Sequence, residues 1–278
     1  MKVYKPDRSN GFTVFDAQMY LSNFLVELQE IPFTSEERLL LLLQVILGRL
    51  VNERTRPFFF YHFAPLFVKA VNTFFCDEEM PLIVDLGCGS GSASILFGLL
   101  GVRVIGIDLD STLISACRKR QAFYEAEFGP LDIEFYAADA FKFDYARIAP
   151  VDGIYSLFAF NTMQPSQELL ARVIPALKSK GKIVISDGNM DSLYNRLFRS
   201  RLALTPSRMQ SALSANGCKV ISLEFHCVLP PVVARIRSAL ELGLRVEHML
   251  DRRGLMRWLG VSYTIVAERR AGIRLAAL

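Results

Sequence analysis

The sequence predicts an α/β protein with a doubly wound, mostly parallel, seven-stranded sheet. From residue 80 onward, apolar β-rich runs alternate with segments long enough to form crossover helices. The first run leads into a glycine-rich turn, "VDLGCGSGSAS", which is typical of a strand followed by a tight turn and a helix. The segment before residue 80 has helical spacing instead. We therefore expect a helical layer to precede the sheet.

Residues 1–79 are expected to form this N-terminal helical cap. Thr34 has the context of a helix N-cap, with Glu37 as its capping-box partner three residues on. The most apolar run, Leu39–Val51, is interrupted by polar residues and is shorter than the roughly 20 residues that span a bilayer. It is expected to form a buried helix.

Residues 80–278 are expected to form the sheet domain. Its strands are predicted in "PLIVDLG", "VRVIGIDLD", "DIEFYAAD", "VDGIYSLFAF", "GKIVISDG", "CKVISLEFHCVL" and "VSYTIVAERR". A helical insertion at about 230–258 separates the last two runs. These two strands could pair antiparallel, which would give the sheet an antiparallel edge strand.

Charge and cysteine content narrow the class of protein. The net charge of +4 is only mildly basic and by itself decides nothing about partners. Nucleic acid is not the expected partner, because the sequence shows no appended RNA-binding motif. The five cysteines show no short paired spacing, so we expect neither a metal site nor a secreted disulfide framework. The N-terminus lacks the apolar stretch of a signal peptide, and a cytoplasmic location is expected.

The glycine turn suggests a nucleotide-like ligand. Gly87, Gly89 and Gly91 would let the backbone adopt positive φ and approach a ligand closely. The helix that follows would direct its free N–H groups toward the same point. The spacing departs from the G-x-G-x-x-G pattern of nicotinamide dehydrogenases, and the chain has no Tyr-x-x-x-Lys pair. A dehydrogenase is therefore set aside.

Two acids follow the next two strands, Asp108 in "VIGID" and Asp139 in "EFYAADAF". Together with "DLGCGSG", they make the sequence from about Pro81 to Gly188 resemble class I S-adenosylmethionine-dependent methyltransferases, which have a Rossmann-like fold. The resemblance implies that Asp108 binds the ribose hydroxyls and that Asp139 binds the adenine amino group. It places further cofactor contacts at Asp85, Gly87, Cys88, Gly89, Gly91, Leu109, Ala140, Phe141 and Phe158.

Methyl transfer is a direct displacement, so the protein mainly has to align donor and acceptor and exclude water. A base would assist a hydroxyl or acidic carbon acceptor. His62 and Tyr61, in the aromatic helix predicted from Pro57, are the candidate catalytic residues. Both could instead have a structural role, and His226 and His248 are weaker candidates.

The acceptor is expected to be a small or lipid-like organic molecule. The end of the fourth strand lacks the Asn-Pro-Pro-aromatic motif of enzymes that methylate base or glutamine amino groups. Arginines in the insertion fit a solvated face, an anionic substrate or peripheral membrane contact. They are Arg235, Arg237, Arg245, Arg252, Arg253 and Arg257. An RNA or protein methyltransferase and a non-catalytic S-adenosylmethionine-binding partner protein are the alternatives, and the oligomeric state stays open.

Overall fold

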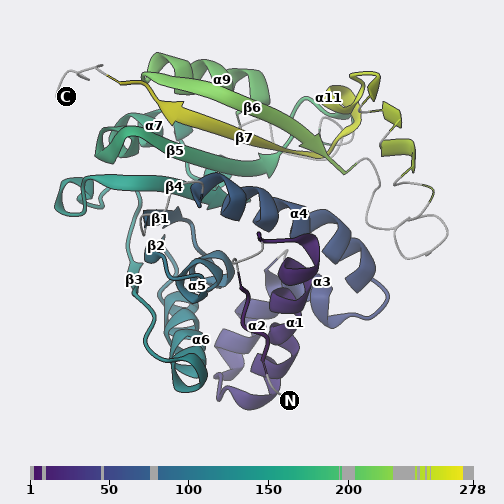
Figure 1. The fold of residues 1–278 in the computed structure, drawn as a ribbon, viewed down its shortest axis with the longest axis vertical. Helices are drawn as coiled ribbons and strands as arrows, with labels where there is room; N and C mark the ends of the chain where they lie inside the picture. The colour runs from purple at the N-terminus through teal and green to yellow at the C-terminus, as the bar shows by residue number, and fades with distance from the viewer. Residues whose placement is uncertain are drawn as a thin grey trace. The chain divides into compact units, whose positions relative to one another are not determined.

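The computed structural model describes residues 3–7, 11–44, 47–75, 81–193, 195, 204–227, 242, 245–247, 249–250 and 252–271. The chain divides into two compact units, Met1–Phe143 and Asp144–Leu278. A seven-stranded sheet has the order β3 (Ile133–Ala137), β2 (Arg103–Asp108), β1 (Leu82–Leu86), β4 (Val151–Leu157), β5 (Leu177–Gly188), β7 (Ser262–Arg269) and β6 (Cys218–His226) (Figure 1). The predicted fold class is confirmed.

The first unit begins with a helical layer. Its helices are α1 (Val14–Glu30), α2 (Ser35–Leu43), α3 (Leu47–Val51) and α4 (Arg56–Phe74), drawn in purple to blue in Figure 1. The Thr34 hydroxyl accepts the Glu37 N–H at 3.1 Å, and the Glu37 carboxylate accepts the Thr34 N–H at 2.7 Å. This confirms the predicted capping box.

The prediction of one buried helix over Leu39–Val51 is wrong. Gln44 follows α2 with an extended ψ of 131°, and α3 begins only at Leu47. The side of α2 that faces the protein carries Glu37, which is 3% exposed and bonded to α6 (Ser111–Phe128). As a result, Leu39 is left 57% exposed. The apolar run therefore indicated a helix but not which face of it is buried.

Strands β1, β2 and β3 pair in parallel, so the loops that follow them leave the same edge of the first unit. The register aligns Leu86 with Ile107, and Asp108 with Ala137. α5 (Ser92–Leu99) and α6 make the connections and pack against these strands. The glycine loop, the residues after β2 and the residues after β3 are thereby brought to one edge.

In the second unit, β4 pairs in parallel with β5, and β7 pairs antiparallel with both β5 and β6. The predicted antiparallel pairing of the last two strands is confirmed. Among its described residues, the helices include α7 (Ser166–Val173), α9 (Pro206–Ala215) and α11 (Met256–Leu259), with 3-10 turns at Tyr145–Arg147, Phe160–Thr162 and Ile174–Ala176. α9 packs on β6 and β7.

The predicted insertion at about 230–258 lies largely outside the described residues, as do its Arg235, Arg237 and His248. Four further insertion arginines are exposed: Arg245, Arg252, Arg253 and Arg257. Within the described ranges, every helix is too short or too polar to cross a bilayer. The predicted boundary between residues 79 and 80 stays a prediction.

Candidate functional site

The glycine loop between β1 and α5 has left-handed backbone at alternate residues. Gly87, Gly89 and Gly91 have φ values of 67°, 52° and 71°, which residues with a Cβ rarely adopt. The N–H groups of Gly87 and Cys88 both donate to the Ile107 carbonyl oxygen, at 2.8 and 3.0 Å. These bonds fix the loop against the end of β2.

Asp108 ends β2, and backbone groups hold its carboxylate in place. Oδ2 accepts the Gly89 N–H at 2.8 Å, and Oδ1 accepts the Asp110 N–H at 3.0 Å. A carboxylate offers about four lone-pair positions, so each oxygen can accept a further hydrogen bond. Two acceptor oxygens side by side fit the two hydroxyls of a ribose, each of which can donate.

The two residues after Asp108 have different structural roles. Asp110 caps α6, because its Oδ1 accepts the N–H groups of Thr112 and Leu113 at 2.8 and 3.1 Å. Asp108 is thus not required as the helix cap. Leu109 is 77% exposed, which leaves an apolar surface beside Asp108 on which a flat ring could pack.

The residues after β3 form a short turn at the same edge. Asp139 Oδ1 accepts the Phe141 N–H at 2.9 Å, and Oδ2 lies 3.8 Å from Lys142 Nζ. The Asp139 side chain is 35% exposed, Phe141 is half-buried and Ala140 is buried. The carboxylate can therefore still accept a hydrogen bond from a donor such as an amino group.

Asp85 is a buried carboxylate in β1, just before the glycine loop. Its Oδ2 accepts the Ser94 hydroxyl at 2.6 Å. Burial raises the pKa of Asp85 to about 7, and the negative charge of Asp108 adds to the rise. A cationic group nearby would favour the ionised carboxylate. Contact of Asp85 with an ammonium group stays a prediction.

Two residues of the loop face the protein interior. Cys88 is 9% exposed, and burial together with a hydrogen bond to Cys117 raises the pKa of its thiol. A Cβ at Gly91 would lie 2.8 Å from Cys117 Sγ and 3.1 Å from Phe135 Cζ. Packing alone therefore requires glycine at position 91. Direct contacts of Cys88 and Gly91 with the cofactor stay predictions.

Gln44 reaches the glycine loop from the helical layer, and the sequence analysis missed it. A Cβ at Gly89 would lie 3.0 Å from Gln44 Oε1. In the sequence, Gln44 appears only as a polar interruption of an apolar run. No local pattern links it to Gly89, because the contact depends on how α2 packs on α6.

The structure places His62 among aromatic rings of α4. Its ring stacks on Phe58 with the centroids 5.8 Å apart, and meets Phe63 edge-on at 5.0 Å. His62 is 7% exposed, whereas its neighbour Tyr61 is half-buried. Catalytic roles for these two residues stay predictions.

In the second unit, Phe158 follows β4 with a left-handed φ of 54°, and its N–H donates to the Ser186 carbonyl oxygen at 2.8 Å. Left-handed backbone at a residue other than glycine often occurs at functional sites. Asn161 lies three residues on, and its N–H donates to Asp187 Oδ2 at 2.7 Å. The cofactor contact predicted for Phe158 stays a prediction.

Side chains of three strands also join in this unit. Thr264 Oγ1 lies 2.8 Å from Ser186 Oγ and 3.0 Å from His226 Nε2. Ser186 and Thr264 are buried, and His226 is half-buried. The sequence analysis considered His226 but missed both hydroxyls, because β5, β6 and β7 bring them together only in the sheet. Across the described residues, no group of three potential ligands gathers that could hold a metal ion.

Comparison with known protein families identifies the chain. Residues 78–227, more than half of its length, match the family described as "Methyltransferase domain". The chain belongs to the S-adenosylmethionine-dependent methyltransferase family. It is therefore an S-adenosylmethionine-dependent methyltransferase enzyme. Solved structures with the same fold hold S-adenosylmethionine or S-adenosylhomocysteine. A search of curated proteins found no match to the sequence of this chain.

Solved structures of other methyltransferases share the fold at low sequence identity. Magnesium protoporphyrin IX methyltransferase from Synechocystis PCC 6803, with bound S-adenosylmethionine, is 13% identical with a TM-score of 0.55, over 89% of this chain and 97% of the other. A putative S-adenosylmethionine-dependent methyltransferase from Listeria monocytogenes is 15% identical with a TM-score of 0.54, covering 74% and 99%. One from Mesorhizobium loti is 20% identical with a TM-score of 0.52, covering 73% and 98%.

Proposed function

We propose that this methyltransferase transfers a methyl group from S-adenosylmethionine to a small or lipid-like organic acceptor. The observation that carries the proposal is a pair of exposed leucines directly before Gln44 in the sequence. The Gln44 side chain lies close enough to Gly89 to leave little room for a Cβ there, and Leu42 and Leu43 are 36% and 68% exposed. Exposed apolar side chains in the segment that reaches the loop favour an acceptor that buries apolar surface.

The residues of the first unit are proposed to hold the cofactor in defined roles. Asp108 would accept the ribose hydroxyls, Leu109 would pack on the adenine, and Asp139 would accept the adenine amino group. Asp85 would face the ammonium group, and Gly87 and Gly89 would allow the loop to approach the cofactor closely. The bound cofactor supplies an electrophilic methyl group on a sulfonium. The task of the protein is then to align the acceptor with that methyl group and to exclude water.

Contacts of one basic run, on α6, count against a phosphate-binding site at that run. Arg118, Lys119 and Arg120 form the basic run of α6, and each bonds within the first unit. Arg118 donates to the Phe135 carbonyl oxygen at 2.7 Å, and Lys119 pairs with Glu37 at 2.6 Å. Phosphate contacts require available cationic side chains. This run is therefore not a free phosphate-binding surface.

The catalytic candidates differ in how they could reach an acceptor. His62 is enclosed by Phe58 and Phe63, whereas Tyr61 is half-buried. Exposure therefore favours Tyr61 as the group that contacts the acceptor, with His62 supporting the aromatic packing of α4. A Tyr61→Phe variant would remove the hydroxyl while leaving the ring.

The proposal is tested with cofactor labelled on the methyl group. Wild type and Asp108→Ala would each be incubated with three separate fractions: an organic-solvent extract of cells, total RNA and a protein extract. We expect label in the organic-soluble fraction with wild type only. Label in RNA or protein alone would reject the small-molecule acceptor and support the corresponding macromolecular methyltransferase. Binding of the cofactor without transfer to any fraction would contradict the proposal as well.

A further inference from the structure

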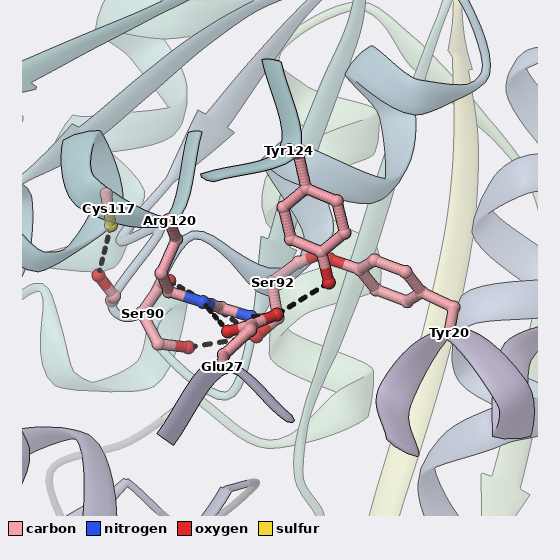
Figure 2. A network of polar contacts seen from close by, with 8 residues as sticks. Tyr20, Glu27, Ser90, Ser92, Cys117, Arg120 and Tyr124 are labelled. Atoms are coloured by element: carbon pink, nitrogen blue, oxygen red, sulfur yellow. Dashed lines mark hydrogen bonds and ion pairs between the residues drawn. The ribbon is translucent and has the colours of Figure 1, made fainter. Parts of the chain in front are cut away.

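A buried ion pair links α1 to the glycine loop through α6. Glu27 of α1 and Arg120 of α6 pair at 2.5 Å, with side chains 0% and 2% exposed. Figure 2 shows the Arg120 guanidinium between Glu27 on one side and Ser90 of the loop on the other. The same guanidinium nitrogen that donates to the Ser90 carbonyl oxygen also donates to Ser92 Oγ at 3.1 Å.

Two tyrosines extend this network (Figure 2). The Tyr20 hydroxyl, from α1, donates to the Ser92 carbonyl oxygen at 2.6 Å. The Tyr124 hydroxyl, from α6, donates to Glu27 Oε1 at 2.6 Å. α1 thus holds the loop and the first residue of α5 in two ways, directly through Tyr20 and indirectly through Glu27 and Arg120.

Burial makes this arrangement sensitive to change. Burial by itself would lower the pKa of Arg120, but the Glu27 carboxylate more than offsets this and holds the pKa above its usual range. Burial and the charge of Glu27 raise the pKa of the Tyr124 hydroxyl. Arg120 and Tyr124 therefore remain protonated donors. A buried charge that loses its partner is strongly destabilising, so the groups are held in one arrangement.

A second ion pair on the same helix provides a contrast. Lys119 pairs with Glu37 of α2 at 2.6 Å, and the Lys119 side chain is 33% exposed. Lys119 also donates to the Pro32 carbonyl oxygen at 3.2 Å. Both contacts join α6 to the helical layer and neither reaches the glycine loop. Of these two adjacent residues of α6, Lys119 therefore attaches the helical layer, whereas Arg120 supports the glycine loop.

We infer that Glu27 and Arg120 are positioning residues for the glycine loop, through which α1 sets the affinity for the cofactor. The inference rests on the proposed assignment of this loop to S-adenosylmethionine. Arg120 fixes the Ser90 carbonyl oxygen between Gly89 and Gly91, so loss of the contact would free a loop that must approach the cofactor closely. Glu27 acts by orienting and neutralising Arg120.

The test compares three variants by calorimetric titration with S-adenosylhomocysteine, the demethylated product. Arg120→Lys keeps a charge for Glu27, but one ammonium group cannot reproduce the fork that also binds the loop. The double variant Glu27→Met/Arg120→Met replaces the pair with apolar groups and leaves no buried charge unpaired. Lys119→Met removes the neighbouring ion pair as the matched control.

We expect the dissociation constant to rise about tenfold in Arg120→Lys and in the double variant, as for loss of a charge-assisted hydrogen bond. In Lys119→Met it should stay within about twofold of wild type. Circular dichroism and the unfolding midpoint would be measured on every variant. A purely structural role would lower the midpoint without changing the affinity of the folded protein.

Each other outcome has a defined meaning. Wild-type affinity in folded Arg120→Lys, or an equal loss in Lys119→Met, would overturn the inference. If the double variant does not fold, Arg120→Lys decides by the same criterion, with Tyr124→Phe as a milder perturbation of Glu27. Asp108→Ala distinguishes the two proposals: unchanged affinity there rejects the proposed ribose contact, whatever Arg120→Lys shows. A wild type that does not bind would overturn both.

Discussion

Polar side chains are held by different kinds of hydrogen bond at the glycine-loop edge of the first unit and at the strand ends of the second unit. Around the glycine loop, main-chain N–H groups hold a carboxylate, as Gly89 and Asp110 do for Asp108. At the ends of β5, β6 and β7, side chains bond to one another, as in the link between Ser186, Thr264 and His226. The first arrangement depends on backbone conformation, and the second on strand register.

This difference decides which of the two arrangements can be identified from the amino-acid sequence. A backbone turn needs glycine at fixed positions, so a short motif reveals it. Hydrogen bonds between strands need only compatible side chains, and many pairs satisfy this. The glycine loop of the first unit can therefore be identified from the sequence, whereas the side-chain link at the strand ends of the second unit cannot.

Asp108→Ala should have the largest effect. Loss of two hydrogen bonds to a charged acceptor should weaken binding of S-adenosylhomocysteine about a hundredfold or more. Asp110→Ala is the matched control, because it removes the cap of α6 at a cost of about 1 kcal/mol in stability but should keep the affinity. Calorimetric titration measures both. Equal affinity losses in the two variants would mean that the turn as a whole matters, rather than the ribose contact.

The pH dependence of stability should show the burial of Asp85. Its pKa is about 7 in the folded protein against an ordinary pKa of 3.8 in the unfolded chain. The folded state therefore binds the proton more tightly, and this contribution to stability is complete below about pH 4 and is lost as the pH rises through 7. Between pH 5 and 7 the ligand-free protein should lose about 2 kcal/mol from this group.

Asp85→Asn removes this titration and can still accept the Ser94 hydroxyl. Urea unfolding of both proteins at pH 5 and pH 7 measures the difference. The variant should lose less stability than wild type over this interval. Parallel curves for the two proteins would show that Asp85 titrates at its ordinary pKa in the folded state.

Thr264→Val tests the strand ends of the second unit. It removes the hydroxyl between Ser186 and His226 at nearly constant volume, and should lower the free energy of unfolding by about 1–2 kcal/mol. Affinity for S-adenosylhomocysteine should be unchanged. Thr264→Ser, which keeps the hydroxyl, should retain more of the stability in denaturant titrations. If Thr264→Val weakens cofactor binding, the two regions are not independent.

Leu109→Ala should have the smallest effect. Leu109 is 77% exposed in the ligand-free protein, so its truncation should hardly change stability. Loss of apolar contact with the adenine should weaken binding by about threefold to tenfold, or roughly 1 kcal/mol. Leu39→Ala, at a residue that is 57% exposed on α2, is the control for truncation of a surface leucine. Equal affinities of both variants would argue against an adenine contact at Leu109.

The amino-acid sequence by itself determined the fold class, the order of the strands along the chain and the position of the glycine loop. These depend on local patterns: alternating apolar runs, glycines that permit positive φ, and acids directly after strands. The capping box at Thr34 and Glu37 was predicted for the same reason, because its partners are three residues apart. The break at Gln44 was not, since an apolar run does not show which side of a helix packs.

Only the tertiary structure decided the contacts between distant segments. Glu27 and Arg120 belong to different helices, and neither carries a local signal for an ion pair. Gln44 meets Gly89, and Thr264 joins Ser186 to His226, because helix packing and sheet register bring them together. Burial then gives these contacts their strength, since a polar group removed from water must find its partner within the protein. That condition is met only once the chain has folded.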